Sequence, residues 1–164
     1  MSLYFLNITI HVLAAVCWLG GMFFLAAVGA PVLRRLEPPE LRADLFRQLG
    51  HKARNLSWVA IAILLLTGVA NLHFGGVLHW SILGELGFWR SPYGQALAWK
   101  LTMVGLMLPI QALHDFVIGP GASRFEPGSP EAVAVRRRAA WFGRVNAVLA
   151  LILLVAAVRL ARGA

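Results

Sequence analysis

Five residues between positions 100 and 114 carry amine, thioether, amide and imidazole groups through a stretch that is otherwise apolar enough to cross a membrane. They are spaced three, four, four and three residues apart, which places them on one face of a helix: Lys100, Met103, Met107, Gln111 and His114. An ionisable side chain inside a membrane span costs at least ~2.5 to 3.5 kcal/mol on insertion scales, so it usually faces protein or water. We therefore expect this face to point inward and to mark a cofactor, an ion path or a buried polar pair.

A second chemical stripe lies near the N-terminus. His11, Trp18, Met22 and Gly29 follow steps of seven, four and seven and share one helix face. Imidazole and thioether groups are ligands for Cu(I), and imidazole is also a common haem ligand. The two stripes together could supply metal-binding chemistry on facing helices.

Depth along the predicted helices, at ~1.5 Å per residue, sorts the polar residues into two layers. His11, His73 and Lys100 each lie a few residues below one end of their spans and form the predicted outer layer. Structural explanations stay open here, because Lys100 could snorkel outward and His73 could sit at the lipid interface. Met103 and Met107 could simply pack in the bundle.

The second predicted layer lies near the other end of the spans. His114 and Asp115 are adjacent, at a level that Arg144 and Asn146 could approach. The histidine and aspartate could pair with Arg144 or cap a helix end, so this layer is as easily structural as functional.

The elements that must position these residues are four apolar runs. The chain has 164 residues, of which 59% are hydrophobic and 13% charged, far from the roughly 25% charged of a soluble domain. Each run is near or above the ~20 residues that cross a bilayer; they cover about 3–33, 56–79, 95–119 and 139–160. The sequence predicts an all-α, integral membrane, antiparallel four-helix bundle that forms a single domain over residues 1–164.

The basic residues predict the orientation of this bundle. Of the fifteen Lys and Arg residues, eleven lie in or beside the first and third loops. Positive residues accumulate on the cytoplasmic side, so both termini and the middle loop are predicted outside, in a multi-pass protein of a bacterial inner membrane. This distribution explains the net charge of +8 without a nucleic-acid partner. Cys17 is the only cysteine and forms no disulfide framework.

The loops carry their own signals. Pro38 and Pro39 precede an amphipathic segment that predicts a short surface helix leading into the second span. The aromatic middle loop, 80–95, is typical of the headgroup level, and the Gly- and Pro-rich third loop, 119–138, predicts an irregular link.

Short segments of the chain resemble a known family. Three of them resemble the small four-helix members of the copper-resistance protein D (CopD) family: "HVLAAVCWLGGMFFLAAVGAPVLRR" (11–35), "LLLTGVANL" (64–72) and "ALHDFVIGP" (112–120). The His-and-Trp first helix and the Lys-Leu start of the third span are more distantly similar to the HemJ group of haem-associated protoporphyrinogen oxidases, with His11 and Lys100 at the matching positions. The loop lengths depart from that group, so its oxidase activity does not carry over directly.

Haem b in the outer half is the first mechanism that these resemblances and residues imply. His11 would be one axial ligand, and His73 the second, with Lys100 or Met103 as less favoured choices. The other contacts would be Trp18 against the macrocycle and Lys100 or Arg90 at the propionates. Such a haem-dependent membrane oxidoreductase would exchange electrons with a quinone, a porphyrinogen or a periplasmic partner. We favour haem at this stage because His11, His73 and Lys100 share one layer.

Copper binding or import is the alternative. His11, Met22, Met103, Met107 and His114 would supply ligands along a path, and a periplasmic copper protein would be the partner. The chain has only four methionines and no Met-rich outer loop to collect metal. A third class is a non-catalytic assembly protein, whose small-residue faces would serve partner binding or homo-oligomer formation.

Overall fold

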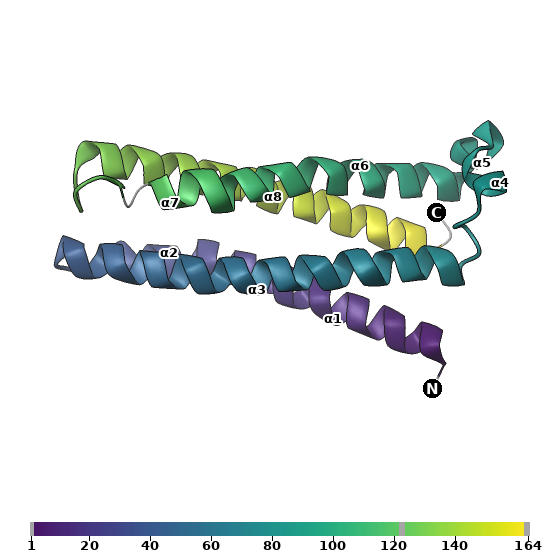
Figure 1. Cartoon of the computed structure of the whole chain (residues 1–164), viewed down its shortest axis with the longest axis horizontal. Coiled ribbons are helices and arrows are strands. Elements are labelled where there is room, and N and C mark those ends of the chain that lie inside the picture. The colour runs from purple at the N-terminus through teal and green to yellow at the C-terminus, as the bar shows by residue number, and fades with distance from the viewer. Residues whose placement is uncertain (1, 122–123, 163–164) are drawn as a thin grey trace.

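The computed structural model describes residues 2–121 and 124–162, and throughout these ranges the regular structure is helical (Figure 1). Pro39 and Pro130 occupy the first turns of two long helices, where proline is well tolerated, and Ser129 caps the second of them by accepting from the Ala132 amide. The elements are α1 Leu3–Phe24, η1 Leu25–Gly29, α2 Ala30–Leu33, α3 Pro39–Phe74, α4 Trp80–Leu83, α5 Leu86–Arg90, α6 Pro92–Ala112, η2 Leu113–Ile118, α7 Gly119–Gly121 and α8 Pro130–Ala161.

Four stretches are long and apolar enough to cross a membrane, which confirms the prediction of an all-α membrane bundle. They are Leu3–Leu33, Pro39–Phe74, Pro92–Gly121 and Pro130–Ala161. Large apolar side chains along them are exposed, as expected of surfaces that face lipid rather than water.

Two helix boundaries differ from the predicted spans. The second run was expected to continue to residue 79, but α3 ends at Phe74, where Gly75 caps it and Gly76 takes a positive φ of 68°. The third loop was expected to be irregular up to residue 138, but α8 already begins at Pro130. The amphipathic segment after Pro39 is continuous with the second span, as predicted.

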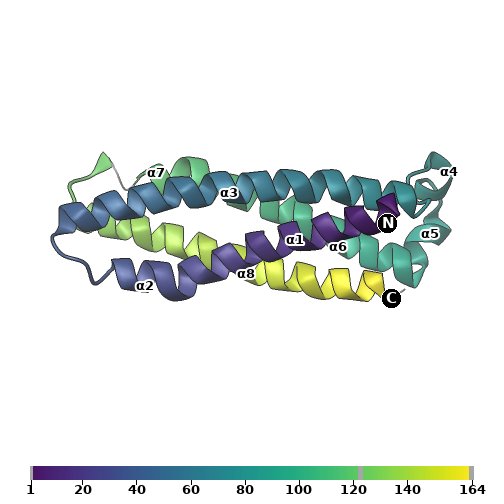
Figure 2. The ribbon, with the colours of Figure 1, turned by 90° about the horizontal axis from the view of Figure 1, so that it is seen from below.

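The helices form two antiparallel hairpins. α1 packs along α3 and α6 packs along α8, whereas contact between the hairpins is slight and runs mainly between α1 and α8. Figure 2 shows both termini at the same end of the molecule as α4 and α5, and the two basic loops at the opposite end. We call these the outer and inner ends, following the predicted orientation.

A small apolar core joins the hairpins midway along the bundle. One buried cluster contains residues from all four long helices: Trp18 of α1, Ala60 and Ile61 of α3, Met107 of α6 and Ala150 of α8. The polar residues lie toward either end of this cluster, so the core separates the two layers that the sequence predicts.

Candidate metal-binding site and a second polar layer

The outer layer is built around a hydrogen bond between the His11 ring and Thr67. His11 Nδ1 lies 2.7 Å from Thr67 Oγ1, and the Thr67 hydroxyl lies 2.6 Å from the Ile63 carbonyl oxygen. A hydroxyl has one proton to donate, and the carbonyl can only accept. Thr67 therefore accepts from His11 Nδ1–H, and no residue that the structure describes forms a hydrogen bond with Nε2, whose lone pair is free in the neutral ring. This is the tautomer and the supporting contact typical of a metal-ligating histidine.

Neighbouring amides hold this arrangement in place. Asn7 Nδ2 donates to the Thr67 carbonyl oxygen at 3.0 Å and to Asn71 Oδ1 at 2.8 Å. Gly68 lies beside the imidazole, since a Cβ built there would be in ordinary van der Waals contact with His11 Cε1, at 3.7 Å. Sequence reasoning missed Asn7, Thr67 and Asn71. Their spacing was the available signal, since Asn7 and His11 are four residues apart on α1, as are Thr67 and Asn71 on α3.

The inward stripe of α6 runs from this layer into the core. Met103 and Met107 are buried, at 7% and 4% exposure. Lys100 is half-buried and within electrostatic range of His11. On α1, Met22 is half-buried against the apolar core that contains Trp18, and the buried Trp18 Nε1 finds no acceptor among the residues that the structure describes.

His73 and Arg90 are placed differently from His11. Both are exposed at the outer end, and His73 follows Thr67 by six residues, or ~9 Å along the helix axis. The described residues give neither side chain a hydrogen bond to the outer layer; His73 instead contacts Phe74, with ring centroids 5.9 Å apart. Of the predicted haem contacts, the structure brings His11 and Lys100 to one layer, packs Trp18 in the core, and leaves His73 and Arg90 at the surface.

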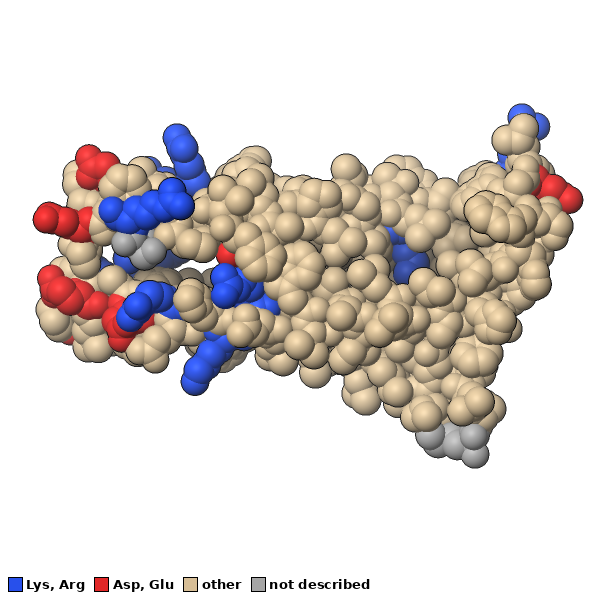
Figure 3. Space-filling view, in the orientation of Figure 1, with Lys and Arg blue, Asp and Glu red and all other residues tan. Residues whose placement is uncertain are grey.

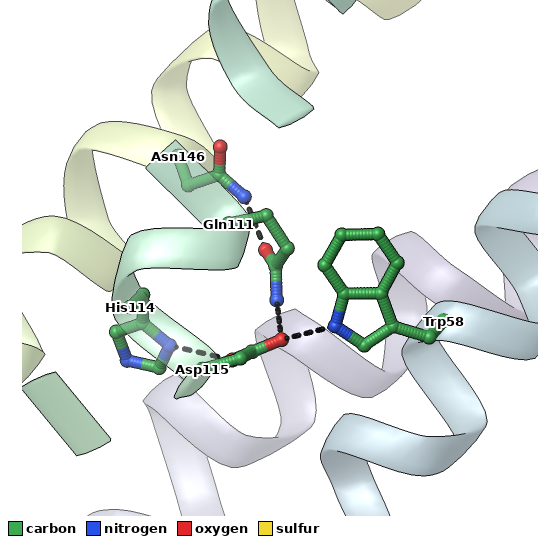
Figure 4. Close-up of polar contacts among 5 residues, drawn as sticks. All are labelled: Trp58, Gln111, His114, Asp115 and Asn146. Atoms are coloured by element: carbon green, nitrogen blue, oxygen red, sulfur yellow. Dashed lines mark hydrogen bonds and ion pairs between the residues drawn. The ribbon is translucent and has the colours of Figure 1, made fainter. Parts of the chain in front are cut away.

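The inner layer is a hydrogen-bonded network centred on Asp115 (Figure 4). Its carboxylate lies 3.0 Å from Trp58 Nε1, 2.7 Å from Gln111 Nε2 and 2.7 Å from His114 Nδ1. Asn146 Nδ2 in turn donates to Gln111 Oε1. The network therefore connects α3, α6, η2 and α8, and it joins the two hairpins.

A change in helix geometry sets up this network. Pro109 lies inside α6 and lacks an amide proton, and four residues later the chain enters the π-helix η2. π-helical turns widen a helix locally and often occur at functional sites. His114 and Asp115 both lie in η2, and Asp115 is only 9% exposed.

The predicted ion pair with Arg144 is not formed. Gly143 of α8 faces the His114 ring, because a Cβ built on Gly143 would lie 3.8 Å from His114 Nε2. The next residue on a helix is rotated by about 100°, so Arg144 points away and is exposed. Within the described chain, the Asp115 carboxylate is instead satisfied by Trp58, Gln111 and His114.

A metal site of the usual hard or borderline type is not assembled in the described ranges. No group of three or more His, Cys, Asp or Glu side chains gathers there. Metal binding would therefore combine imidazole with the methionine thioethers of the stripe, which is a ligand set suited to Cu(I).

Comparison with known proteins places the chain in a family. The model of the family described as "Copper resistance protein D" matches residues 52–160, which include α6, η2 and most of α3 and α8. The chain belongs to the CopD family. It is also 29% identical, over 155 residues, to an uncharacterised protein of Aquifex aeolicus (strain VF5), covering 94% of this chain and 92% of that protein. No solved structure gives a significant match. The family model covers the last three spans of this protein, whereas α1, which carries His11, lies outside the matched residues.

Proposed function

We propose that this CopD-family protein binds Cu(I) as cargo within its membrane bundle and acts in copper uptake or resistance. Membership in a family described by copper resistance supports copper, and it gives no support to the haem centre that we favoured from the sequence. The order of the two alternatives is therefore reversed. Haem-dependent electron transfer stays an untested alternative, as does a purely structural assembly role.

The observation that carries the proposal is the fixed tautomer of His11. Because Thr67 accepts from Nδ1–H, Nε2 is held as a lone-pair donor before any metal arrives. Cu(I) is soft and accepts imidazole nitrogen together with thioether sulfur. Met103 is buried on the inward face of α6, three residues along the chain from Lys100 of the outer layer, and is therefore the thioether that we propose as the second ligand. His11 and Met103 are our proposed ligands. The positive charge of Lys100 would disfavour a second cation beside them.

A path inward follows from the remaining thioethers. Met107 lies one helical turn below Met103, or ~6 Å along α6, and Met22 packs against the same core cluster. His114 lies a further seven residues along the chain, and its Nδ1 is held by Asp115, so Nε2 of the neutral ring is bare, as in His11. Copper would move by exchange between these soft ligands, with His114 as the inner terminus of the path.

The orientation completes this proposal. The positive-inside distribution supports an orientation with His11 on the outer side and the basic loops in the cytoplasm. Copper would then enter from a periplasmic donor near the outer end. Fusing a reporter that is active only in the cytoplasm to the C-terminus tests this: a silent fusion supports the orientation, and an active one reverses the direction of the path.

Metal analysis combined with an absorption spectrum tests the proposed cargo. The full chain is expressed with added copper and haem precursor, purified in detergent and analysed for both. We expect copper bound at about one per chain, lost in His11→Ala and kept in His51→Ala, a control at an exposed position of α3. A Soret band without copper would favour haem instead. Protein that carries neither metal would favour the assembly role.

A further inference from the structure

The inner end of the molecule contains a basic cavity that the copper path does not use. It has a volume of about 570 Å³, within the roughly 300 to 1,000 Å³ of small-molecule sites, and lies between the α2 terminus, α3 and α8. Five arginines line it: Arg34, Arg42, Arg136, Arg137 and Arg144. Figure 3 shows Lys and Arg side chains gathered toward this end of the molecule, while the middle is almost free of charge.

Acidic side chains also lie at the tip of this end (Figure 3), but none of the residues that line the cavity is acidic. Arg42 lies 3.3 Å from Glu37, whose side chain is 69% exposed, and this is the one ion pair that the five arginines form within the described residues. Arg136 lies over the Phe46 ring, 5.4 Å from its centroid. Like charges that share a cavity repel each other, so five arginines around one space favour an anionic ligand.

The chemistry of the lining indicates the kind of anion. Guanidinium groups bind phosphate oxygens in a bidentate, planar geometry that a lysine cannot reproduce. Phe46, Val133 and Ala140 add apolar surface to the same cavity. A ligand that carries both a phosphate and an apolar portion would use both parts of this lining.

The position of the cavity indicates where that ligand comes from. Arg136 and Arg137 lie in the second and third turns of α8, and exposed large apolar side chains follow along the helix from Trp141 onward. This is the level of the lipid headgroups, where basic pockets between helices bind anionic lipids. We propose that the cavity binds a phosphate group carried by the headgroup of an anionic phospholipid, which bridges the two hairpins at the inner end.

A bound lipid would reinforce the contact between the hairpins at this end, where Arg136 of α8 already lies over the Phe46 ring of α3. α3 belongs to one hairpin and α8 to the other, and the hairpins touch only slightly. A phosphate between Arg42 of α3 and Arg136 of α8 would link them at the end of the molecule, beyond the Asp115 network.

Neighbouring residues provide a matched pair of test variants. Arg34→Gln with Arg137→Gln removes two exposed charges from the cavity lining. Arg35→Gln with Arg138→Gln removes two exposed charges, each one residue away, that do not line it. Both double variants lower the net charge equally, so a difference between them reports the cavity. Arg34→Lys with Arg137→Lys keeps the charge and removes only the guanidinium geometry.

Native mass spectrometry of the full chain, incubated with equal amounts of phosphatidylglycerol and phosphatidylcholine, measures which lipid is retained. We expect wild type to retain phosphatidylglycerol, with about tenfold weaker binding in the lining variant, a change below about threefold in the control, and an intermediate loss in the lysine variant. Equal losses in the lining and control variants would overturn the proposal, because surface charge alone would then explain binding. No preference of wild type for the anionic lipid would overturn it as well.

A second arm separates a lipid from a soluble phosphate. The protein is placed in phosphatidylcholine nanodiscs and titrated calorimetrically with inorganic phosphate. We expect no saturable binding at millimolar phosphate, because a free ion leaves the apolar part of the cavity unfilled. Saturable binding that is lost only in the lining variant would keep the phosphate site and overturn the lipid as its source. Thermal unfolding of each variant in the same nanodiscs confirms that the variants are folded.

Discussion

His11 in the outer layer donates its Nδ1 proton to the hydroxyl of Thr67, whereas His114 in the inner layer lies against the carboxylate of Asp115. The two rings are held by the same nitrogen, but their surroundings differ in charge. The outer layer contains Lys100 and lacks a carboxylate within the described residues, while the inner layer contains a buried aspartate. The Thr67 hydroxyl adds no charge beside the His11 ring, and the Asp115 carboxylate makes His114 part of a polar network.

The two layers also differ in which helices they connect. The outer hydrogen bonds of the Asn7 and His11 side chains join α1 to α3, which belong to one hairpin. The inner bonds join Trp58 of α3 to Asp115 of η2 and therefore cross between the hairpins. The inner layer links the two hairpins, whereas the outer layer lies within one of them. Both histidines keep Nε2 free, so the layers differ in how they stabilise the bundle and in the charge around the ring, not in the histidine nitrogen that each offers.

Removing the outer imidazole should give the largest effect on copper. Loss of a supporting contact costs about 10- to 100-fold in metal affinity, so loss of the ligand itself in His11→Ala should exceed about 100-fold. Competition with a Cu(I) chelator measures this affinity. The unfolding temperature should change little. An affinity within threefold of wild type would remove His11 from the site.

Removing the inner carboxylate should instead affect stability. Asp115→Ala leaves the buried Trp58 and Gln111 donors without their acceptor, and each unsatisfied donor costs about 1 to 3 kcal/mol, so we expect a loss of about 3 kcal/mol. Denaturant unfolding in detergent micelles measures the loss. Copper affinity of the folded fraction should stay within about threefold of wild type. A stable variant with strongly weakened copper binding would show that the roles of the two layers are reversed.

Thr67 tests whether the hydroxyl orients the outer histidine. Thr67→Val removes the acceptor for Nδ1–H at nearly constant shape, and copper affinity should fall by about 10- to 100-fold. Thr67→Ser keeps the hydroxyl and is the matched control, with an expected change below about threefold. The same chelator competition measures both variants. Equal affinities of the valine and serine variants would contradict the assigned tautomer.

The methionines should give the smallest effects on stability. Met103→Leu and Met107→Leu conserve volume, so each should cost less than about 1.5 kcal/mol. Met103→Leu should weaken equilibrium copper binding by about tenfold, whereas Met107→Leu should mainly slow copper uptake into vesicles. If both variants bind and transport copper like wild type, the two thioethers serve only packing.

Sequence reasoning predicted the all-α membrane bundle, because the length and hydropathy of the four runs determine it. Depth along the spans put His11 and Lys100 in one layer, but it also put His73 there, which the structure leaves exposed at the outer end. The steps along residues 100–114 were sufficient to identify the inward face of α6, on which Met103 and Met107 are buried. The long-range partners were harder to predict. Trp58 meets Asp115 across 57 positions of sequence, and that contact depends on how the two hairpins pack. Thr67 was not predicted as a partner of His11, because no pattern around a threonine in an apolar run indicates a histidine on another helix.

X-ray absorption at the copper edge tests the contrast between the two layers most directly. Cu(I) is loaded at one equivalent into wild type, His11→Ala and His114→Ala, and the ligand atoms are read from the scattering. We predict nitrogen and sulfur around copper in wild type and in His114→Ala, and loss of the nitrogen in His11→Ala. Loss of the nitrogen in His114→Ala alone, or spectra that are the same in all three proteins, would contradict the assignment of copper to the outer layer.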